Sequence, residues 1–244
     1  MKMGQVVVVG GSKGLGRVVA ERFAAQGHPV TVISRSPAAG NAVGRHLPVD
    51  LETMDSADAV VSEVLRGSDR LRYLIFCQRY RGQGDRWQGE MHVSLNVTRL
   101  LIDGFRDCFI EEGDRAVGVV SSVYADRVGG SQPVSYHVAK AGLNQLVHHN
   151  AWTLGRQGIR INAVMPLTYL KAESQAFYLN DTETMEMYRR LVPLGKMGTA
   201  DDVADVLEFL CSEKAAFVNG QSIYVDGGVS VVWPEELAQS MRTR

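Results

Sequence analysis

The chain has 244 residues, of which 45% are hydrophobic and 22% are charged, and these proportions are ordinary for a globular protein. Its formal net charge of -1 creates no overall positive field, which argues against a protein that binds nucleic acid or anionic membranes. No apolar run is long enough for a signal peptide or a membrane span, so we expect a cytoplasmic protein. The three cysteines, Cys77, Cys108 and Cys211, have no metal-binding spacing, which predicts buried or partly buried thiols and no metal site.

Short apolar segments alternate with amphipathic segments along the whole chain. Apolar runs predict strands at 5–9, 29–33, 47–49, 71–76, 116–120, 160–164 and 222–225. Helical spacing predicts helices at 17–26, 55–65, 91–109, 136–154 and 201–210, with Thr199 or Asp201 capping the last one, and one or two short helices within 167–194. This alternation, without a linker or a repeat, predicts a single-domain α/β protein over residues 1–244, with a Rossmann-type doubly wound parallel sheet and helices on both faces.

A glycine-rich turn joins the first predicted strand to the first predicted helix. Gly10, Gly14 and Gly16 follow the valine run at 5–9 and precede the amphipathic segment. Glycines in this context let the backbone turn tightly and approach a pyrophosphate, which rests on the N-terminus of the following helix. The motif is weak in isolation, but between a strand and a helix it predicts dinucleotide binding.

Arg35 stands at the end of the second predicted strand, where many dinucleotide-binding folds carry an acid that binds the adenosine ribose. Such an acid accepts a hydrogen bond from the 2′-hydroxyl of NAD and repels the 2′-phosphate of NADP. Here Arg35, with Ser34 and Ser36 as further donors, and Lys13 from the glycine turn place cations on two sides of that phosphate. We therefore expect NADP(H) to be preferred over NAD(H).

Tyr136 and Lys140 stand four residues apart in the segment predicted to be a helix at 136–154. Side chains at this spacing share one face of a helix, so the phenol and the ammonium can lie side by side. A nearby positive charge lowers the pKa of a phenol, which suits it to exchange a proton with a carbonyl or an alcohol. The spacing alone also fits a packed tyrosine next to a solvated lysine, so its meaning depends on the rest of the chain.

Together these motifs resemble those of the short-chain dehydrogenase/reductase family over nearly the whole chain. The resemblance includes the glycine turn, Asp50, Asn96, Ser122, the Tyr136/Lys140 pair, Asn162-Ala163-Val164-x-Pro166 and the closing Asn219-Gly220…Val225-Asp226-Gly227-Gly228. The chain looks most like the branch that includes the ketoacyl-carrier-protein reductases. The resemblance implies an NADPH-dependent oxidoreductase that reduces a carbonyl to an alcohol, or runs the reverse reaction, on a small molecule.

The resemblance also implies a role for each matching residue. Tyr136 would be the acid/base, Lys140 would bind the nicotinamide ribose and lower the pKa of Tyr136, and Ser122, rather than its neighbour Ser121, would hydrogen-bond the substrate oxygen. Asn96 would hold a water that links Lys140 to solvent, and Asp50 would serve the adenine ring. The implied cofactor-binding residues are Gly10, Ser12, Lys13, Gly14, Leu15, Gly16, Arg35, Ser36, Asp50, Leu51, Cys77, Tyr136, Lys140, Pro166 and Thr168.

The chain departs from the family pattern at three places. Val9 replaces the usual Thr, Leu167 replaces the usual Gly after Pro166, and Cys77-Gln78-Arg79-Tyr80 replaces the usual Asn-Asn-Ala-Gly next to the nicotinamide ribose. Two alternatives therefore stay open. One is an enzyme of the same fold with other chemistry, such as dehydration or epimerisation. The other, which the last replacement supports, is a dinucleotide-binding regulator without turnover.

Four basic residues fall in two loops that follow predicted strands. Arg79, Arg81 and Arg86 lie after the strand at 71–76, and Lys171 lies after Pro166, within a predicted substrate loop at 167–197. Ligands bind at the carboxyl ends of strands in this architecture, and arginine binds carboxylate or phosphate through paired hydrogen bonds. These residues predict an anionic substrate, with solvated loop charges as the alternative.

The predicted helix at 136–154 carries small residues that allow close packing, namely Ala139, Ala141 and Gly142. In the resembled family this helix and the one with Asn96 pair across a two-fold axis, and closed symmetric oligomers are common among enzymes. We expect a homo-oligomer, a tetramer rather than a dimer. Residues 229–244 form a C-terminal extension, from which Trp233 and Leu237 are expected to pack on a neighbouring subunit.

Overall fold

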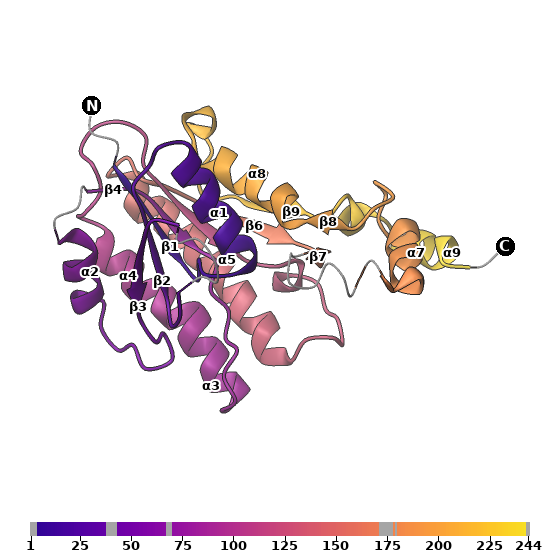
Figure 1. The fold of residues 1–244 in the computed structure, drawn as a ribbon. Coiled ribbons are helices and arrows are strands. Elements are labelled where there is room, and N and C mark those ends of the chain that lie inside the picture. Colours follow the sequence, from indigo (N-terminus) through magenta and orange to yellow (C-terminus); the bar gives the residue numbers. More distant parts are fainter. Residues whose placement is uncertain (1–3, 38–42, 67–69, 171–177, 179, 243–244) are drawn as a thin grey trace.

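The computed structural model describes residues 4–37, 43–66, 70–170, 178 and 180–242. Within these residues seven parallel strands form one sheet in the order β3-β2-β1-β4-β5-β6-β9 (Figure 1). The strands are β1 (Gln5–Val9), β2 (Val30–Ser34), β3 (Arg45–Pro48), β4 (Leu71–Phe76), β5 (Ala116–Val120), β6 (Arg160–Pro166) and β9 (Ser222–Val225). The chain adds strands on one side of β1 and then, from β4 onward, on the other, which confirms the predicted doubly wound sheet.

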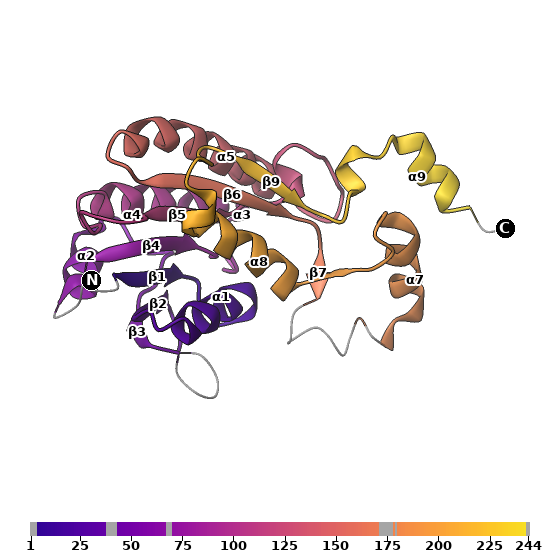
Figure 2. The same ribbon diagram turned by 90° about the horizontal axis from the view of Figure 1, so that it is seen from above.

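Helices cover both faces of the sheet. The α-helices are α1 (Gly14–Ala25), α2 (Asp58–Leu65), α3 (Arg86–Glu90), α4 (Val97–Phe105), α5 (Val134–Gly155), α7 (Thr182–Leu191), α8 (Ala200–Cys211) and α9 (Pro234–Ser240). A π-helix, η1 (Met91–Asn96), joins α3 to α4, and 3₁₀ turns lie at η2 (Val123–Ala125), η4 (Glu213–Ala215) and η5 (Val229–Val231). Figure 2 shows α4 and α5 along one side of the sheet and α1 and α8 along the other.

The valine run of β1 is continuous because both faces of this strand are buried. Val7 and Val9 pack with α2, α4 and α5, while Val6 and Val8 pack with α1 and α8. Successive side chains of a strand point to opposite faces, so a central parallel strand needs an apolar residue at every position. Each fully buried side chain of this kind contributes roughly 1.5–3 kcal/mol of transfer free energy.

Four predicted helical segments differ from the structure by more than two residues or in kind. The helix predicted at 55–65 begins at Asp58. The first helix begins at Gly14 rather than at residue 17, because the glycine turn already contains its first helical residues. The helix predicted at 91–109 begins at Arg86, where Asp85 caps it by accepting a hydrogen bond from the Gln88 amide at 2.8 Å, and ends at Phe105. Within 167–194 the structure has a strand, β7 (Tyr169–Leu170), before helix α7.

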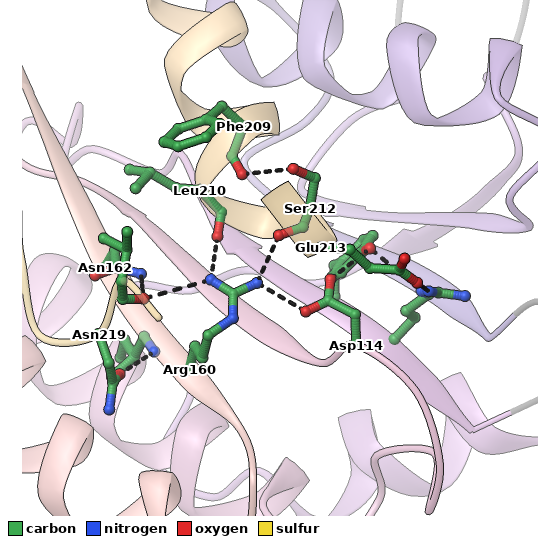
Figure 3. A network of polar contacts seen from close by, with 12 residues as sticks. Asp114, Arg160, Asn162, Phe209, Leu210, Ser212, Glu213 and Asn219 are labelled. Carbon is green, nitrogen blue, oxygen red and sulfur yellow. Dashed lines mark hydrogen bonds and ion pairs between the residues drawn. The ribbon is translucent and has the colours of Figure 1, made fainter. Parts of the chain in front are cut away.

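A buried arginine connects several segments at the amino-terminal ends of the strands. Arg160, the first residue of β6, donates hydrogen bonds to the backbone carbonyls of Leu210 at 2.6 Å and Ser212 at 3.0 Å (Figure 3). The same guanidinium reaches the Val218 carbonyl at 3.5 Å and forms an ion pair with the buried Asp114 at 2.9 Å. The end of α8 is thereby tied to β6 with its last carbonyl groups satisfied.

The segments around α7 and α9 project from the carboxyl-terminal side of the sheet (Figure 1). Tyr188, Val192 and Met197 form a small apolar cluster there, and β7 pairs with β8 (Gly198–Thr199). Thr199, and not Asp201, caps α8 through a capping box with Asp202. In the described ranges, no helix has both the length and the apolar character needed to cross a membrane.

Candidate active site

A cavity of about 960 Å³ lies at the carboxyl edge of the sheet. Its lining comes from the glycine turn, from the ends of β2, β4, β5 and β6, from the start of α5 and from Tyr188 of α7. The sequence-predicted residues in this lining are Gly10, Ser12, Lys13, Gly14, Leu15, Gly16, Arg35, Ser36, Asp50, Leu51, Cys77, Ser122, Tyr136, Lys140, Pro166 and Thr168. Every predicted cofactor-binding residue is therefore in one cavity, together with three of the four predicted catalytic residues.

The glycine turn leaves no room for a side chain at Gly10 or at Gly16. Gly10 has a φ of 80°, and a Cβ atom on it would lie 2.7 Å from the Gln78 backbone nitrogen. A Cβ atom on Gly16 would overlap the Gly10 carbonyl oxygen. At the N-terminus of α1, Lys13 makes no capping hydrogen bond and the first turn has no acidic residue. The backbone N–H groups in the first turn of α1 are thus left without side-chain partners. Together with the positive end of the helix dipole, they fit the pyrophosphate of a dinucleotide.

The adenosine end of the cavity carries a charge pair. The Arg35 guanidinium, whose side chain is 55% exposed, lies 3.0 Å from a Glu52 carboxylate oxygen. Asp50 accepts a hydrogen bond from the Glu52 amide at 3.0 Å, and this bond orders the turn that presents Glu52. The Ser34 hydroxyl donates to the Ser36 carbonyl at 2.8 Å, so it is engaged within its own turn.

Ser122, Tyr136 and Lys140 meet where β5 faces α5. Ser122 hydrogen-bonds the Tyr136 phenol, whereas the Ser121 hydroxyl donates to the Lys140 backbone carbonyl at 3.2 Å. Tyr136 is 9% exposed and Lys140 is 3% exposed. The Lys140 Nζ donates to the Val120 carbonyl at 2.8 Å and lies 5.6 Å from the centre of the Tyr136 ring. Phenol and ammonium therefore share one buried helix face, as the spacing predicts.

The pKa of Tyr136 differs from the prediction. Burial raises it above the ordinary value for tyrosine, and the Ser122 hydrogen bond and the Arg79 charge only partly oppose this effect. The predicted net lowering by Lys140 is thus wrong for the protein as it stands, because desolvation of the phenolate is the larger effect. Arg79 is the nearer of two cations at the ring, since its guanidinium carbon lies 4.8 Å from the ring centre and the Lys140 Nζ lies 5.6 Å from it. Burial also lowers the pKa of Lys140 to about 8.

Asn96 lies apart from the other three predicted catalytic residues. It is absent from the cavity lining, and its side-chain oxygen accepts a hydrogen bond from Arg99 at 2.9 Å on the helix surface. Asn96 is the last residue of the π-helix η1, whose backbone hydrogen bonding differs from that of an α-helix. Its predicted role, holding a water that links Lys140 to solvent, stays a prediction.

The segment Cys77-Gln78-Arg79-Tyr80 after β4, which departs from the family pattern, is held by its own packing contacts. Tyr80 is buried, and a Cβ atom on Gly82 or Gly89 would collide with its ring, so these glycines make room for the tyrosine. The Gln78 side-chain amide donates to the Thr98 hydroxyl at 2.7 Å, while its buried oxygen has no protein partner. The segment is thus an ordered wall of the cavity, and the Gln78 oxygen is an acceptor available to a bound hydroxyl.

A smaller cavity of about 460 Å³ adjoins the first and shares Arg79, Tyr80 and Arg81 with it. Arg86 and Glu90 also line it. Neither Arg81 nor Arg86 forms an ion pair within the part of the chain that the structure describes. Two of these arginines therefore have no carboxylate partner there. Lys171, the fourth predicted cation, lies outside the described residues.

The sequence reasoning missed two acidic residues of the site, Glu52 and Glu90. Glu90 falls on the same helical face as Val93 and Val97, so its burial could have been inferred from the periodicity. No comparable signal marks Glu52, because its contact with Arg35 joins two separate loops. Among the described residues, no group of His, Cys, Asp or Glu side chains could hold a metal ion.

The chain is similar to known proteins over nearly its whole length. The family model described as enoyl-(acyl carrier protein) reductase matches residues 9–230. L-Rhamnose 1-dehydrogenase (NAD(P)(+)) from Azotobacter vinelandii is 29% identical, over 93% of this chain and 96% of the relative. A 3-oxoacyl-[acyl-carrier-protein] reductase from Aquifex aeolicus is 26% identical, over 91% and 96%. A crystal structure of the TT0495 protein from Thermus thermophilus has a TM-score of 0.82 and 28% identity, and covers 95% of this chain and 100% of that one.

Proposed function

The chain belongs to the short-chain dehydrogenase/reductase family of oxidoreductases, and from this premise we propose an NADP(H)-preferring enzyme that interconverts a carbonyl and an alcohol, with Tyr136 as acid/base. The observation that carries the proposal is that one cavity contains both the glycine turn and the Ser122, Tyr136 and Lys140 group. A site for a dinucleotide and a site for proton transfer are thus contiguous, which is what hydride transfer to a carbonyl requires.

The three side chains divide the work of the reaction. A bound nicotinamide dinucleotide supplies the hydride to the carbonyl carbon. Tyr136 gives its proton to the carbonyl oxygen, and Ser122, whose oxygen already accepts from the Tyr124 amide at 3.2 Å, redirects its hydroxyl proton from the Tyr136 phenol to that oxygen. Lys140 uses one N–H on the Val120 carbonyl and keeps two donors for ribose hydroxyls and for restoring the Tyr136 proton. Alcohol oxidation reverses each transfer.

The order of the segment after β4 favours an enzyme over a regulator without turnover. Its altered residues are accommodated by packing, and Tyr136 and Lys140 keep their shared face beside it. Neither this nor any other feature favours dehydration or epimerisation over redox chemistry. The test is a panel of aldehydes, ketones and ketoacyl thioesters with NADPH, followed by cofactor absorbance and product analysis. Bound NADPH without turnover across the panel would contradict the proposal.

The preference for NADP(H) rests on two cations that line the cavity, Arg35 and Lys13. Arg35 already holds Glu52, but a guanidinium has five N–H donors and can bind a carboxylate and a phosphate together. Ser36 also lines the cavity, whereas the engaged hydroxyl of Ser34 contributes less than expected. The relative from Azotobacter vinelandii is described as using NAD(P)(+), so a preference in this chain has to come from its own residues.

An anionic substrate is the second part of the proposal. The smaller cavity opens beside Tyr136 and presents Arg79, Arg81 and Arg86 against the single carboxylate of Glu90. This net positive charge suits a carboxylate or phosphate carried by the substrate. Arg81→Gln and Arg86→Gln should each raise KM for an anionic carbonyl substrate about 10- to 100-fold, since a hydrogen bond to a charged group contributes about 1.5–3 kcal/mol. Arg66→Gln, outside both cavities and paired with Glu63, is the matched control. Unchanged KM in both cavity variants would end this part.

We also propose a cytoplasmic homotetramer that binds neither nucleic acid nor membranes. In this proposal residues 167–197 are the substrate loop, and residues 229–244 are an extension used in assembly. Val138 and Trp152 are exposed on α5, and Trp233 is exposed at the start of α9. Exposed apolar side chains on the helix expected to form the two-fold contact support association between copies. Light scattering at micromolar concentration tests this, and a monomer would contradict it.

A further inference from the structure

A carboxylate is buried beside the proton-transfer group and has no role in the mechanism above. Glu90, the last residue of α3, is 4% exposed, and the Ser94 hydroxyl donates to its Oε2 at 2.9 Å. It forms no direct ion pair with any residue that the structure describes. Removing a carboxylate from water is costly unless nearby charge compensates it. Nearby cations stabilise such a buried charge, and Arg79, Arg81 and Arg86 line the same cavity as Glu90.

The cations near Glu90 include Arg79 and the Lys140 ammonium of the proton-transfer group. Helix α3 packs against α5, which carries Tyr136 and Lys140, and Glu90 shares the smaller cavity with Arg79. The charge of Glu90 raises the pKa of both Tyr136 and Lys140, whereas the charge of Arg79 lowers both. One anion and one cation thus act in opposite directions on the same two groups.

The other groups that face this pair come from several elements. Lys140 is faced by Arg79 and Cys77 from the segment after β4 and by the Val120 carbonyl of β5. The groups facing Tyr136 are Ser122 from the end of β5, Arg79 and Arg81 from the segment after β4, and the Tyr124 ring at 6.3 Å. Glu90 is the anionic side chain common to both sets of neighbours.

We propose that Glu90 is a positioning residue, a buried counter-charge fixed by Ser94, that keeps Lys140 protonated and so sets the pH range in which Tyr136 and Lys140 work together. Burial acts against a charged Lys140, and Arg79 adds repulsion. A neutral lysine cannot return a proton to Tyr136 after each reduction. The role of the pair rests on the proposed function, while the electrostatic effect of Glu90 on Tyr136 can be measured without turnover.

The test compares Glu90→Gln with the unmodified protein. Loss of a negative charge favours the deprotonated form of each neighbour, so the pKa values of Tyr136 and Lys140 both fall. In carbonyl reduction the rate should drop about 3- to 10-fold on the alkaline side of the profile and less than about twofold on the acid side, the range expected for the loss of one neighbouring charge. Glu90→Asp should restore the profile.

Two controls separate electrostatics from structure. Glu111→Gln removes an exposed, distant carboxylate and should leave the profile unchanged. Arg79→Gln should move the alkaline limb in the opposite direction, to higher pH, and combining it with Glu90→Gln should cancel much of both shifts. This opposite sign keeps the proposal testable if Glu90→Gln folds poorly. Equal losses at every pH would mean a purely structural role and would overturn it.

A second readout does not depend on activity. Tyrosinate absorbance, taken as the difference between each protein and its Tyr136→Phe version, reports the titration of Tyr136 alone. The midpoint should fall in Glu90→Gln and rise in Arg79→Gln. A shifted titration in a protein without turnover would support the role of Glu90 and count against the proposed function. An unshifted titration would overturn the role of Glu90, whatever the activity.

Discussion

The two edges of the same parallel sheet use arginine in opposite ways. At the amino-terminal edge, Arg160 is buried and its guanidinium binds three backbone carbonyls and Asp114 (Figure 3). At the carboxyl edge, Arg81 and Arg86 line a cavity and form no ion pair with the described residues. The N-terminus of α1 is likewise left without a side-chain cap.

This difference separates the residues that stabilise the fold from the residues that are available to bind a ligand. A buried polar group with all its partners inside the protein stabilises the fold but has no donors left for a ligand. A charged group that is exposed to water adds little to stability and keeps its hydrogen-bond donors for a ligand. Four substitutions test the comparison, from the largest expected effect to the smallest.

Tyr136→Phe tests the carboxyl edge most directly. The variant removes the hydroxyl that carries the proton and keeps the ring, so kcat should fall by about 10²–10⁴. NADPH affinity, measured by calorimetry, should change little, because the dinucleotide contacts of the glycine turn remain. A variant that kept a substantial share of its turnover would show that Tyr136 is not the acid/base.

Arg160→Met tests the amino edge. Asp114 would keep its hydrogen bond from Tyr73 at 3.0 Å but lose its counter-charge, so the free energy of unfolding should fall by about 3–5 kcal/mol. Urea unfolding measures this loss. Adding Asp114→Asn should recover part of it, because no charge then stays buried alone. NADPH affinity of the folded variant should be unchanged; a large loss of affinity would contradict the separation of the two edges.

Gly16→Ala tests whether the glycine turn works through its backbone. Its Cβ atom would meet the Gly10 carbonyl, which cannot move without opening the turn, so NADPH affinity should fall at least ~10-fold, equivalent to about 1.4 kcal/mol. Gly130→Ala is the matched control, because its Cβ atom would meet nothing within 4 Å. Similar affinities in the two variants would rule out the close approach of backbone and pyrophosphate.

Arg35→Asp tests the exposed cation at the adenosine end. The unmodified protein should prefer NADPH over NADH by at least ~10-fold, and the variant should lose or invert this preference because its carboxylate repels the 2′-phosphate. Calorimetry at fixed salt with both cofactors gives the ratio, and turnover through Tyr136 should persist. Tighter binding of NADH by the unmodified protein would show that Arg35 and Lys13 do not read the phosphate.

The sequence by itself determined the sheet and the nucleotide half of the cavity. Strands β1, β4, β5 and β9 have the predicted bounds, since apolar runs between turn residues are a local signal. The glycine turn and the Tyr136/Lys140 face are local as well, because their geometry follows from residue type and from spacing within one turn or one helix.

Only the tertiary structure decided what surrounds Tyr136. Arg79, Ser122 and Glu90 come from three segments that meet because the strands bring their carboxyl ends together, and no short-range pattern reports that meeting. Asn96, at the end of the π-helix η1, lies outside the cavity lining, and Ser94 of the same helix hydrogen-bonds Glu90. Burial and the charge of Glu90 raise the pKa of Tyr136, whereas two arginine charges and one hydrogen bond lower it. The direction of the net shift therefore depends on burial, which exists only once the chain has folded.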